Sequence, residues 1–198
     1  MDQKDIRVDG TDCDGMSVLH HAASEENVHI FDYNLKKVRN IDIDLAGKRT
    51  ALSYAAEIGH LQVAQILVSG YNANVDFAHR EGMTSIMHTA RYSQLDMLAF
   101  LAPLVSDLNS TDAMGGTVVH HLVAWADIWS HNVEEFRSSL ECLVKHGAGL
   151  DVKDNTGRTP YERVCDREKQ ASKCGENIDN FQPLKEVMEQ MLCNPTVP

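Results

Sequence analysis

Residues Asp44 to Val68, with the sequence DLAGKRTALSYAAEIGHLQVAQILV, decide the fold of this chain. The stretch predicts a turn, a short helix, a tight connection at Gly59-His60 and a second helix. Thr50 precedes the first helix, where its hydroxyl can cap backbone N–H groups that otherwise lack partners. The second helix is apolar over more than one stripe, and two helices cannot bury that much surface between themselves. We therefore expect similar helix pairs on both sides.

The same layout recurs along the chain at a nearly constant spacing. In each copy, a turn containing aspartate or glycine precedes a hydroxyl residue and an apolar helix. The hydroxyl residues are Ser17, Thr50, Thr84, Thr117 and Thr159, at separations of 33, 34, 33 and 42 residues. A period near 33, with a turn, T-P-L-H-like residues and two helices, resembles the ankyrin repeat.

The resemblance covers roughly residues 12 to 192 and implies an all-α solenoid of about five helix-turn-helix repeats joined by β-hairpin-like turns. An acidic N-terminal segment, residues 1–11, is expected to precede an ankyrin-repeat domain of residues 12–198. The expected repeats are residues 12–43, 44–76, 77–109, 110–151 and 152–192.

Three departures from the repeat pattern carry further expectations. Repeat four is longer near residues 125–133, and repeat five has a polar insertion, residues 169–180, that we expect to be a loop. In repeat three, Met87 replaces the histidine of the T-P-L-H-like motif. Pro103 is expected to end the second helix of that repeat near Ala102, because proline cannot continue a helix.

Composition disfavours several classes of function. The chain has 198 residues, of which 43% are hydrophobic, and no apolar run of about 18 residues that would span a membrane. Its start lacks the pattern of a signal peptide. A formal net charge of −11 disfavours nucleic acid or an anionic membrane as partner, but suits a protein with a basic face. Five cysteines without a CxxC pair are expected to be reduced thiols in the cytoplasm or nucleus.

Two histidine doublets, His20-His21 and His120-His121, are the candidates for metal binding. His20 and His120 occupy the histidine position of the T-P-L-H-like motif, for which the resemblance implies a structural role near the turns. The doublets are three repeats apart, or about 30 Å at roughly 10 Å between stacked helices, and cannot share one ion. Phosphate-binding, dinucleotide-binding and hydrolase motifs are absent. We predict that the chain is not an enzyme and has no catalytic residue, metal or cofactor.

In ankyrin-like arrays, the turn tips and the first helices form the grooved face that binds a partner. Carried over position by position, the resemblance implies a partner-binding set of Asp14, Met16, Arg49, Glu57, Arg80, Met83, Arg91, Met114, Trp125 and Arg158. Their charge runs from acidic in repeat one to basic in repeats two, three and five. Hydrophobic Met83 and Met114 lie in the middle, and an apolar centre with charged flanks is typical of a protein interface.

Trp125 and Trp129 are the two tryptophans of the chain and border the insertion of repeat four. Their i,i+4 spacing places them on one helix face. Tryptophan is enriched in interface hot spots, so both residues are candidates for partner binding. The alternative is that the insertion extends the first helix and the two rings cover their own repeat.

The sequence thus predicts a non-catalytic protein–protein interaction module. We expect a small adaptor, inhibitor or regulatory subunit of an intracellular enzyme complex such as a protein kinase. The alternative is an IκB-like inhibitor that masks a basic surface of a transcription factor, or a pathogen effector that mimics such a regulator. No nucleic acid, membrane or small-molecule substrate is expected as a partner, and the expected location is cytoplasmic, nuclear or both.

Overall fold

The structure is a computed structural model that describes residues 13, 20, 21, 23, 49–79, 81–124, 132–175, 178 and 181–193. Within these residues the chain is helical and has no β-strand. The elements are α3 (Ala51–Ile58), α4 (Leu61–Gln65), the π-helix η2 (Ile66–Gly70), α5 (Ser85–Arg91), α6 (Leu95–Leu101), α7 (Val118–Val123), α9 (Val133–Lys145), α10 (Pro160–Cys174) and α11 (Phe181–Cys193).

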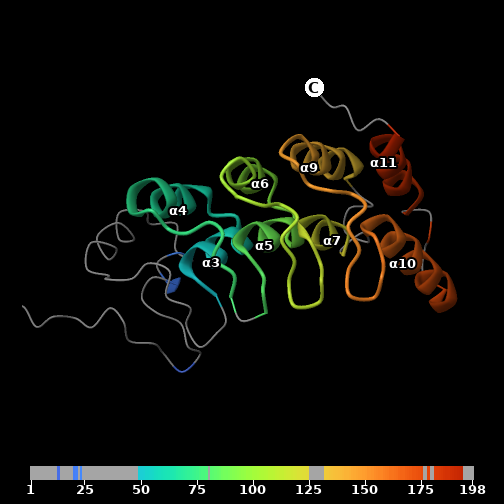
Figure 1. The fold of residues 1–198 in the computed structure, drawn as a ribbon, viewed down its shortest axis with the longest axis horizontal. Coiled ribbons are helices and arrows are strands. Elements are labelled where there is room, and N and C mark those ends of the chain that lie inside the picture. Colours follow the sequence, from blue (N-terminus) through green and yellow to red (C-terminus); the bar gives the residue numbers. More distant parts are fainter. Residues whose placement is uncertain are drawn as a thin grey trace, which may run out of the picture.

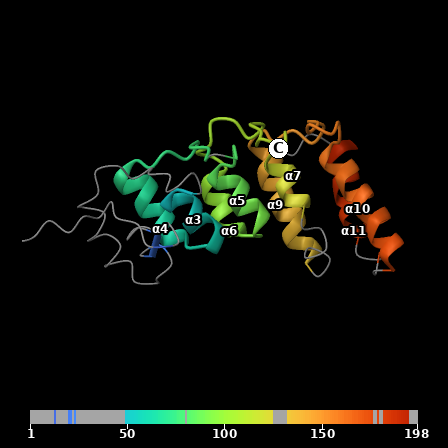
Figure 2. The ribbon, with the colours of Figure 1, turned by 90° about the horizontal axis from the view of Figure 1, so that it is seen from below.

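The helices form two parallel rows (Figure 1). The first helices of the repeats, α3, α5, α7 and α10, make one row, in which each helix contacts the next. The second helices, α4 with η2, α6, α9 and α11, make the other row. Figure 2 shows both rows from below, with the connecting turns along one edge. This arrangement confirms the predicted all-α solenoid.

A threonine begins each first helix of the described repeats. The N-cap residues of α3, α5, α7 and α10 are Thr50, Thr84, Thr117 and Thr159. Thr50 Oγ1 accepts a hydrogen bond from the Ser53 backbone N–H at 3.1 Å. Thr159 forms a capping box with Glu162, and Pro160 occupies the first helical position, where no N–H donor is needed. The predicted helix starts are therefore confirmed at these four threonines.

The hydrophobic core lies between the two rows of helices. Alanines of α3 and α4, including Ala55, Ala56 and Ala64, are completely buried and allow close helix approach. Phe136 of α9 and Phe181 of α11 are the largest buried side chains, at 0% and 2% exposure. Burying a large apolar side chain stabilises the fold by about 1.5–3 kcal/mol, so each helix pair depends on its neighbours.

Two predictions about helix ends have different outcomes. Helix α6 ends at Leu101 with Ala102 as its C-cap, which confirms the effect of Pro103. The expected loop from Lys169 is wrong for residues 169–174, because α10 continues to Cys174. Lysine and glutamine are good helix formers, and Ala171 of this segment is buried at 3% exposure, which anchors the extension.

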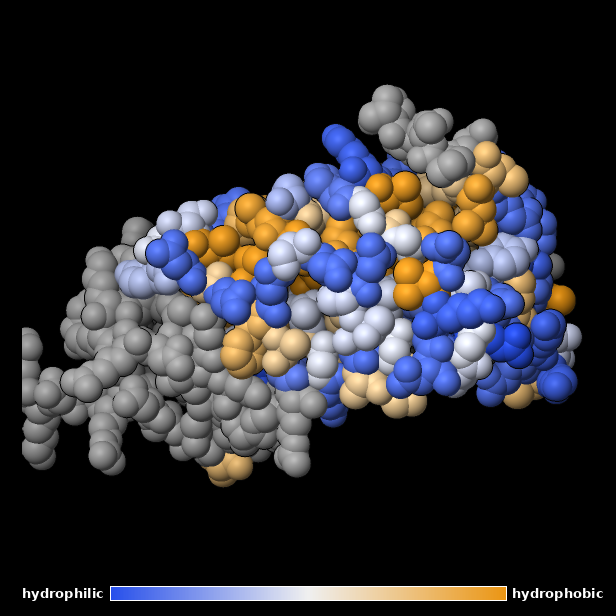
Figure 3. Space-filling view, in the orientation of Figure 1, coloured by the Kyte–Doolittle hydropathy of each residue, from blue (hydrophilic) through white to orange (hydrophobic). Residues whose placement is uncertain are grey.

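Hydrophobic and hydrophilic side chains are unevenly distributed on the face seen in Figure 3. Hydrophobic side chains gather along the row of second helices, whereas hydrophilic ones predominate over α10 and the turns beside it. Across the ranges described above, no helix combines the length and the apolar character needed to cross a membrane.

Candidate protein-binding site

The turns that precede α5, α7 and α10 share one hairpin-like structure. We call them tip three (residues 79 and 81–83), tip four (residues 112–116) and tip five (residues 154–158). The first residue of each tip donates a backbone hydrogen bond to the last: His79 N to Met83 O at 3.1 Å, Asp112 N to Gly116 O at 3.0 Å, and Asp154 N to Arg158 O at 2.9 Å. The carbonyl of the first residue also accepts from the glycine N–H of the same tip. The fourth position is a glycine with φ between 75° and 77°, in the left-handed region that favours glycine.

Neighbouring tips are joined by backbone hydrogen bonds. The Ala113 N–H of tip four donates to Glu81 O of tip three at 2.9 Å. The Asn155 N–H of tip five donates to Met114 O of tip four at 3.1 Å. Asn155 Nδ2 adds a hydrogen bond to Ala113 O at 3.1 Å. The three tips therefore form one continuous edge along the row of first helices.

Each tip is also fixed to its own first helix by a pair of side chains. The first residue of the tip contacts the residue nine positions later, which lies on the helix. These anchor pairs are His79–His88 at 3.1 Å, Asp112–His121 at 2.9 Å, and Asp154–Arg163 at 2.5 Å. The same two positions of the repeat thus hold a histidine–histidine, an aspartate–histidine and an aspartate–arginine pair.

Asp112 organises tip four. Its Oδ1 accepts hydrogen bonds from the N–H groups of Met114 and Gly116, both at 2.8 Å. Its Oδ2 accepts from His121 Nε2. Burial lowers the pKa of His121, and the Asp112 carboxylate opposes that effect.

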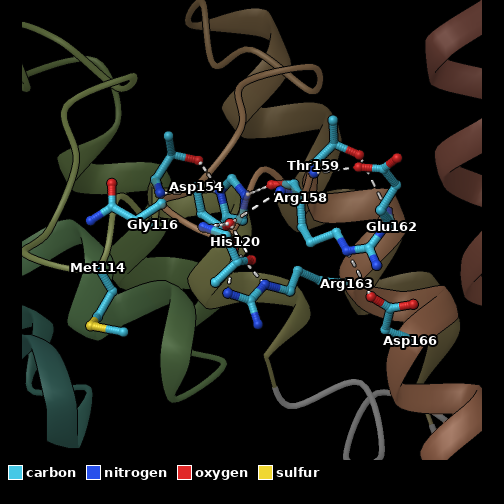
Figure 4. Close-up of polar contacts among 12 residues, drawn as sticks. Met114, Gly116, His120, Asp154, Arg158, Thr159, Glu162, Arg163 and Asp166 are labelled. Atoms are coloured by element: carbon cyan, nitrogen blue, oxygen red, sulfur yellow. Dashed lines mark hydrogen bonds and ion pairs between the residues drawn. The ribbon is translucent and has the colours of Figure 1, made fainter.

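Asp154 organises tip five in the same way (Figure 4). Its Oδ1 accepts from the Thr156 N–H at 2.8 Å and from the Arg158 N–H at 3.1 Å. Loss of hydration opposes ionisation of Asp154, but hydrogen bonds from Thr156, Arg158 and Arg163 outweigh it. Together they hold the pKa of Asp154 well below its usual range, so this tip keeps its anionic anchor under all ordinary conditions.

The motif histidines link successive repeats, as expected. His20 Nε2 donates to Arg49 O at 3.0 Å, and His120 Nε2 donates to Arg158 O at 3.0 Å. His120 Nδ1 also accepts from the Thr117 N–H at 3.1 Å, so both ring nitrogens are used within the framework. The predicted structural role of His20 and His120 is confirmed. In the ranges that the structure describes, no group of three or more histidine, cysteine, aspartate or glutamate side chains is placed to hold a metal ion.

An open groove of about 690 Å³ lies between tips three and four and the first helices behind them. Its lining includes Glu81, Arg91, Met114, His121, Ala124 and Arg167. A second hollow of about 350 Å³ continues it from α7 to α10, where Arg163 and Gln170 contribute. At the edge that both share, the Met114 side chain is 64% exposed. The groove therefore combines an exposed apolar side chain with charged walls.

The structure brings some of the predicted partner-binding residues to this groove and places others elsewhere. Met83, Arg91 and Met114 line it. Arg49 forms an ion pair with Glu57 beside α3. Arg158 of tip five pairs with Asp166 of α10 at 3.0 Å.

Met83 does not meet the expectation of an exposed tip residue. Its side chain is only 4% exposed and belongs to the hydrophobic core, so the expected pair of exposed methionines is reduced to Met114. The remaining residues of the predicted set, Asp14, Met16, Arg80, Trp125 and Trp129, lie outside the described residues. The two alternatives for the tryptophans therefore stay open.

Sequence reasoning missed His121, Arg163 and Arg167, which line the groove or the adjoining hollow from the first helices. The signal for two of them is the spacing of nine residues from the first tip residue, which is visible once the repeats are aligned. In the sequence, Asp12 and His21 stand at the same two positions of repeat one. Arg167 has no such signal, because it reaches the groove through the stacking of α10 on α7.

Stacked helix pairs with linked tips define a solenoid repeat protein. The family model described as ankyrin repeats (3 copies) matches residues 2–76 and 19–112, and the chain belongs to the ankyrin-repeat family. It is also similar to neurogenic locus notch homolog protein 1 of Homo sapiens, Mus musculus and Cricetulus griseus. Each match is 27% identical over 150 residues and covers 76% of this chain. The chain spans about 6% of the length of these curated relatives. Ankyrin repeats mediate protein–protein interaction, so the chain is a protein-interaction module.

Proposed function

We propose that this chain binds a protein partner through the groove between its tips and first helices. In this role it acts as a non-catalytic adaptor, inhibitor or regulatory subunit of an enzyme complex, such as a protein kinase, in the cytoplasm or nucleus. The observation that carries the proposal is the exposed Met114 side chain on a firmly held tip. The five free cysteines fit a reducing compartment.

The backbone of Met114 is fixed from both sides. Its N–H donates to Asp112 Oδ1 at 2.8 Å, and its carbonyl accepts from the Asn155 N–H at 3.1 Å. The side chain points away from the polar network behind it (Figure 4). An apolar side chain on a rigid backbone loses little conformational freedom when it binds, which favours its use as an anchor.

Charged residues surround this apolar anchor. Glu81 and Arg91 lie on the side of tip three and α5, and Arg167 reaches the groove from α10. Interfaces commonly have an apolar centre and a polar rim, and they use arginine frequently. Both features support a protein, rather than a small molecule, as the partner. The proposal extends the surface to Asp14, Met16, Arg80, Trp125 and Trp129.

Affinity capture with the full chain from native extract tests the proposal. We expect Met114→Asp to reduce recovery of the specific partner more than about tenfold, since a charge replaces the apolar anchor. Leu104→Asp is the matched control, because Leu104 is 43% exposed but does not line the groove. Loss of the partner from the Leu104 variant alone, or no specific partner for the wild type, would count against the proposal.

A second candidate function is favoured by the net charge of −11. A strongly acidic chain suits an IκB-like inhibitor that covers a basic surface of a transcription factor. Electrostatic binding weakens steeply as salt rises, whereas binding through an apolar anchor is less sensitive. The salt dependence of binding to the captured partner therefore separates the two functions.

The tryptophans are tested by Trp125→Ala combined with Trp129→Ala. An interface role predicts a folded protein that captures less partner. An unfolded or much less stable product would instead support the alternative, in which the rings cover their own repeat.

A further inference from the structure

The anchor pair of tip three consists of two histidines, His79 and His88. His79 Nδ1 accepts a hydrogen bond from the Glu81 N–H at 3.1 Å, so the ring proton of His79 is on Nε2. This Nε2–H donates to Nε2 of His88 at 3.1 Å, which leaves the proton of His88 on Nδ1. An added proton on His79 Nδ1 would face the Glu81 N–H, and one on His88 Nε2 would face the His79 Nε2–H. The closed tip therefore requires both rings to be neutral.

The described charged groups near the pair do not favour protonation of His88. His79 and His88 are only 7% and 3% exposed. Charged or titratable groups around them are Glu81 on tip three, Arg49 and Glu57 on the side of α3, Arg91 on α5 and His121 on α7. Glu57 Oε2 is 3.9 Å from His88 Nδ1, which is too long for a hydrogen bond, and it forms an ion pair with Arg49. Burial, followed by Arg49 and His79, lowers the pKa of His88 to about 3.

We infer that acidification opens tip three selectively, while tip five stays closed. The His79–His88 contact holds the first residue of tip three against α5. His79 in turn carries two backbone hydrogen bonds of the tip, with Met83 O at 3.1 Å and with the Gly82 N–H at 2.7 Å. Once the tip opens, His88 can be protonated at its ordinary pKa of 6.5. Below that pH, each further unit favours the open form at least about tenfold, because protonation of His88 alone contributes one proton.

The other two anchor pairs provide an internal comparison. In tip four, a proton added to His121 creates an ion pair with Asp112, so protonation does not break the contact. In tip five, Arg163 is always charged and Asp154 stays ionised, so nothing in the pair changes between pH 7 and pH 5. Tip three opens selectively because His79 stands at the position that Asp112 and Asp154 hold in tips four and five.

Opening of tip three affects the groove directly. Glu81 lines the groove, and its carbonyl accepts from the Ala113 N–H of tip four at 2.9 Å. Loss of this contact separates tips three and four beside Met114. Weaker partner binding at low pH is therefore expected, and this consequence rests on the proposed function. The opening of tip three does not depend on the proposed function.

Backbone amide hydrogen exchange of the full chain, without a partner, tests the inference at pH 7 and pH 5. We expect the protection factors of the Glu81, Gly82 and Ala113 amides to fall at least about 25-fold over this range, which is the effect of protonating His88 alone. Those of the Thr156 and Gly157 amides in tip five should change less than about threefold, since their anchor does not titrate. Equal protection of tip three at both pH values would overturn the inference. An equal loss in tip five would also overturn it, by showing global unfolding.

Two variants connect the effect to the histidine pair. His79→Asp gives tip three the aspartate–histidine pair of tip four, and His88→Gln removes the buried ring. In His79→Asp, we expect the protection of tip three to change less than about threefold between pH 7 and pH 5. In His88→Gln, only His79 still has to be neutral, because its Nδ1 accepts from the Glu81 N–H, so we expect a smaller loss of protection than in the wild type. His146→Gln is the control, because His146 is exposed and bonds only locally to Cys142 O, and it should keep the wild-type loss. Wild-type behaviour of His79→Asp and His88→Gln would contradict the inference. If acid opens tip three but does not weaken partner binding, the groove is not the binding site. The inferred opening of tip three would still hold.

Discussion

His121 Nε2 lies 2.9 Å from Asp112 Oδ2, and this contact ties the exposed edge of the solenoid to helix α7. Asp112 also holds the N–H groups of Met114 and Gly116, so one carboxylate sets both the shape of tip four and its position on the helix row. The tips therefore act as a fixed edge, and the exposed Met114 side chain is presented by a preorganised backbone.

Asp112→Ala removes the acceptor of three hydrogen bonds at once. We expect the free energy of unfolding to fall by about 2–3 kcal/mol, because hydrogen bonds to a charged acceptor are strong and two of the three freed donors, the Gly116 N–H and His121 Nε2, are partly buried. Urea denaturation followed by circular dichroism measures the change. Asp107→Ala is the control, because the side chain of exposed Asp107 accepts one local hydrogen bond, from the Asn109 N–H. Equal destabilisation by the two substitutions would show that the hydrogen bonds of Asp112 do not stabilise the fold more than one exposed local hydrogen bond does.

His120→Ala breaks the link between repeats four and five. The imidazole bridges the Thr117 N–H and the Arg158 carbonyl, and both contacts are lost together. We expect a loss of about 1–2 kcal/mol in the free energy of unfolding, with increased hydrogen exchange at the interface of α7 and α10. A variant as stable as wild type would contradict the framework role of this histidine.

Phe136→Ala opens a cavity between the helix rows. The ring is completely buried, and replacing a buried phenylalanine by alanine costs about 3–5 kcal/mol. Leu192→Ala near the end of α11 should cost less than about 1 kcal/mol, because Leu192 is 42% exposed. Thermal and urea unfolding of the two variants provide the comparison. A larger loss of stability for Leu192→Ala than for Phe136→Ala would contradict the position of the core between the helix rows.

The stability of the whole chain should decrease with acid because of His88. In the folded state its pKa is about 3, while the unfolded chain has the ordinary value of 6.5. Below pH 6.5 the unfolded chain therefore binds more protons, and folding stability falls until about pH 3. The expected slope is up to about 1.4 kcal/mol per pH unit for this residue. Urea denaturation at pH 7, 6 and 5 measures it, and His88→Gln should flatten the dependence. Parallel curves for wild type and variant would exclude His88 as the source.

The helix starts and the repeat period could be predicted because their signals are local. Thr50 and Thr159 stand directly before apolar helices, and the capping hydrogen bonds need only nearby residues. The extension of α10 to Cys174 was hidden by its polar composition, since the burial of Ala171 depends on contacts made by the folded chain. For the same reason, the burial of Met83 could not be read from its place in a turn.

The candidate site was predicted less completely than the fold. Met83, Arg91 and Met114 were predicted from their repeat positions and lie along the groove. Arg167 was missed, because its approach to tip four depends on how α10 packs on α7. The His79–His88 pair breaks the aspartate pattern of the other tips, so only the structure reveals what the substitution does.

The central claim is that the tip edge is the face that binds a protein. Its most direct test is photo-crosslinking, with benzoylphenylalanine introduced at the position of Met114 and, separately, at the position of Leu104. Both side chains are exposed, at 64% and 43%, but Met114 lines the groove and Leu104 does not. We predict a crosslink to the captured partner from position 114 and none from position 104. A crosslink from position 104, with none from position 114, would contradict the account.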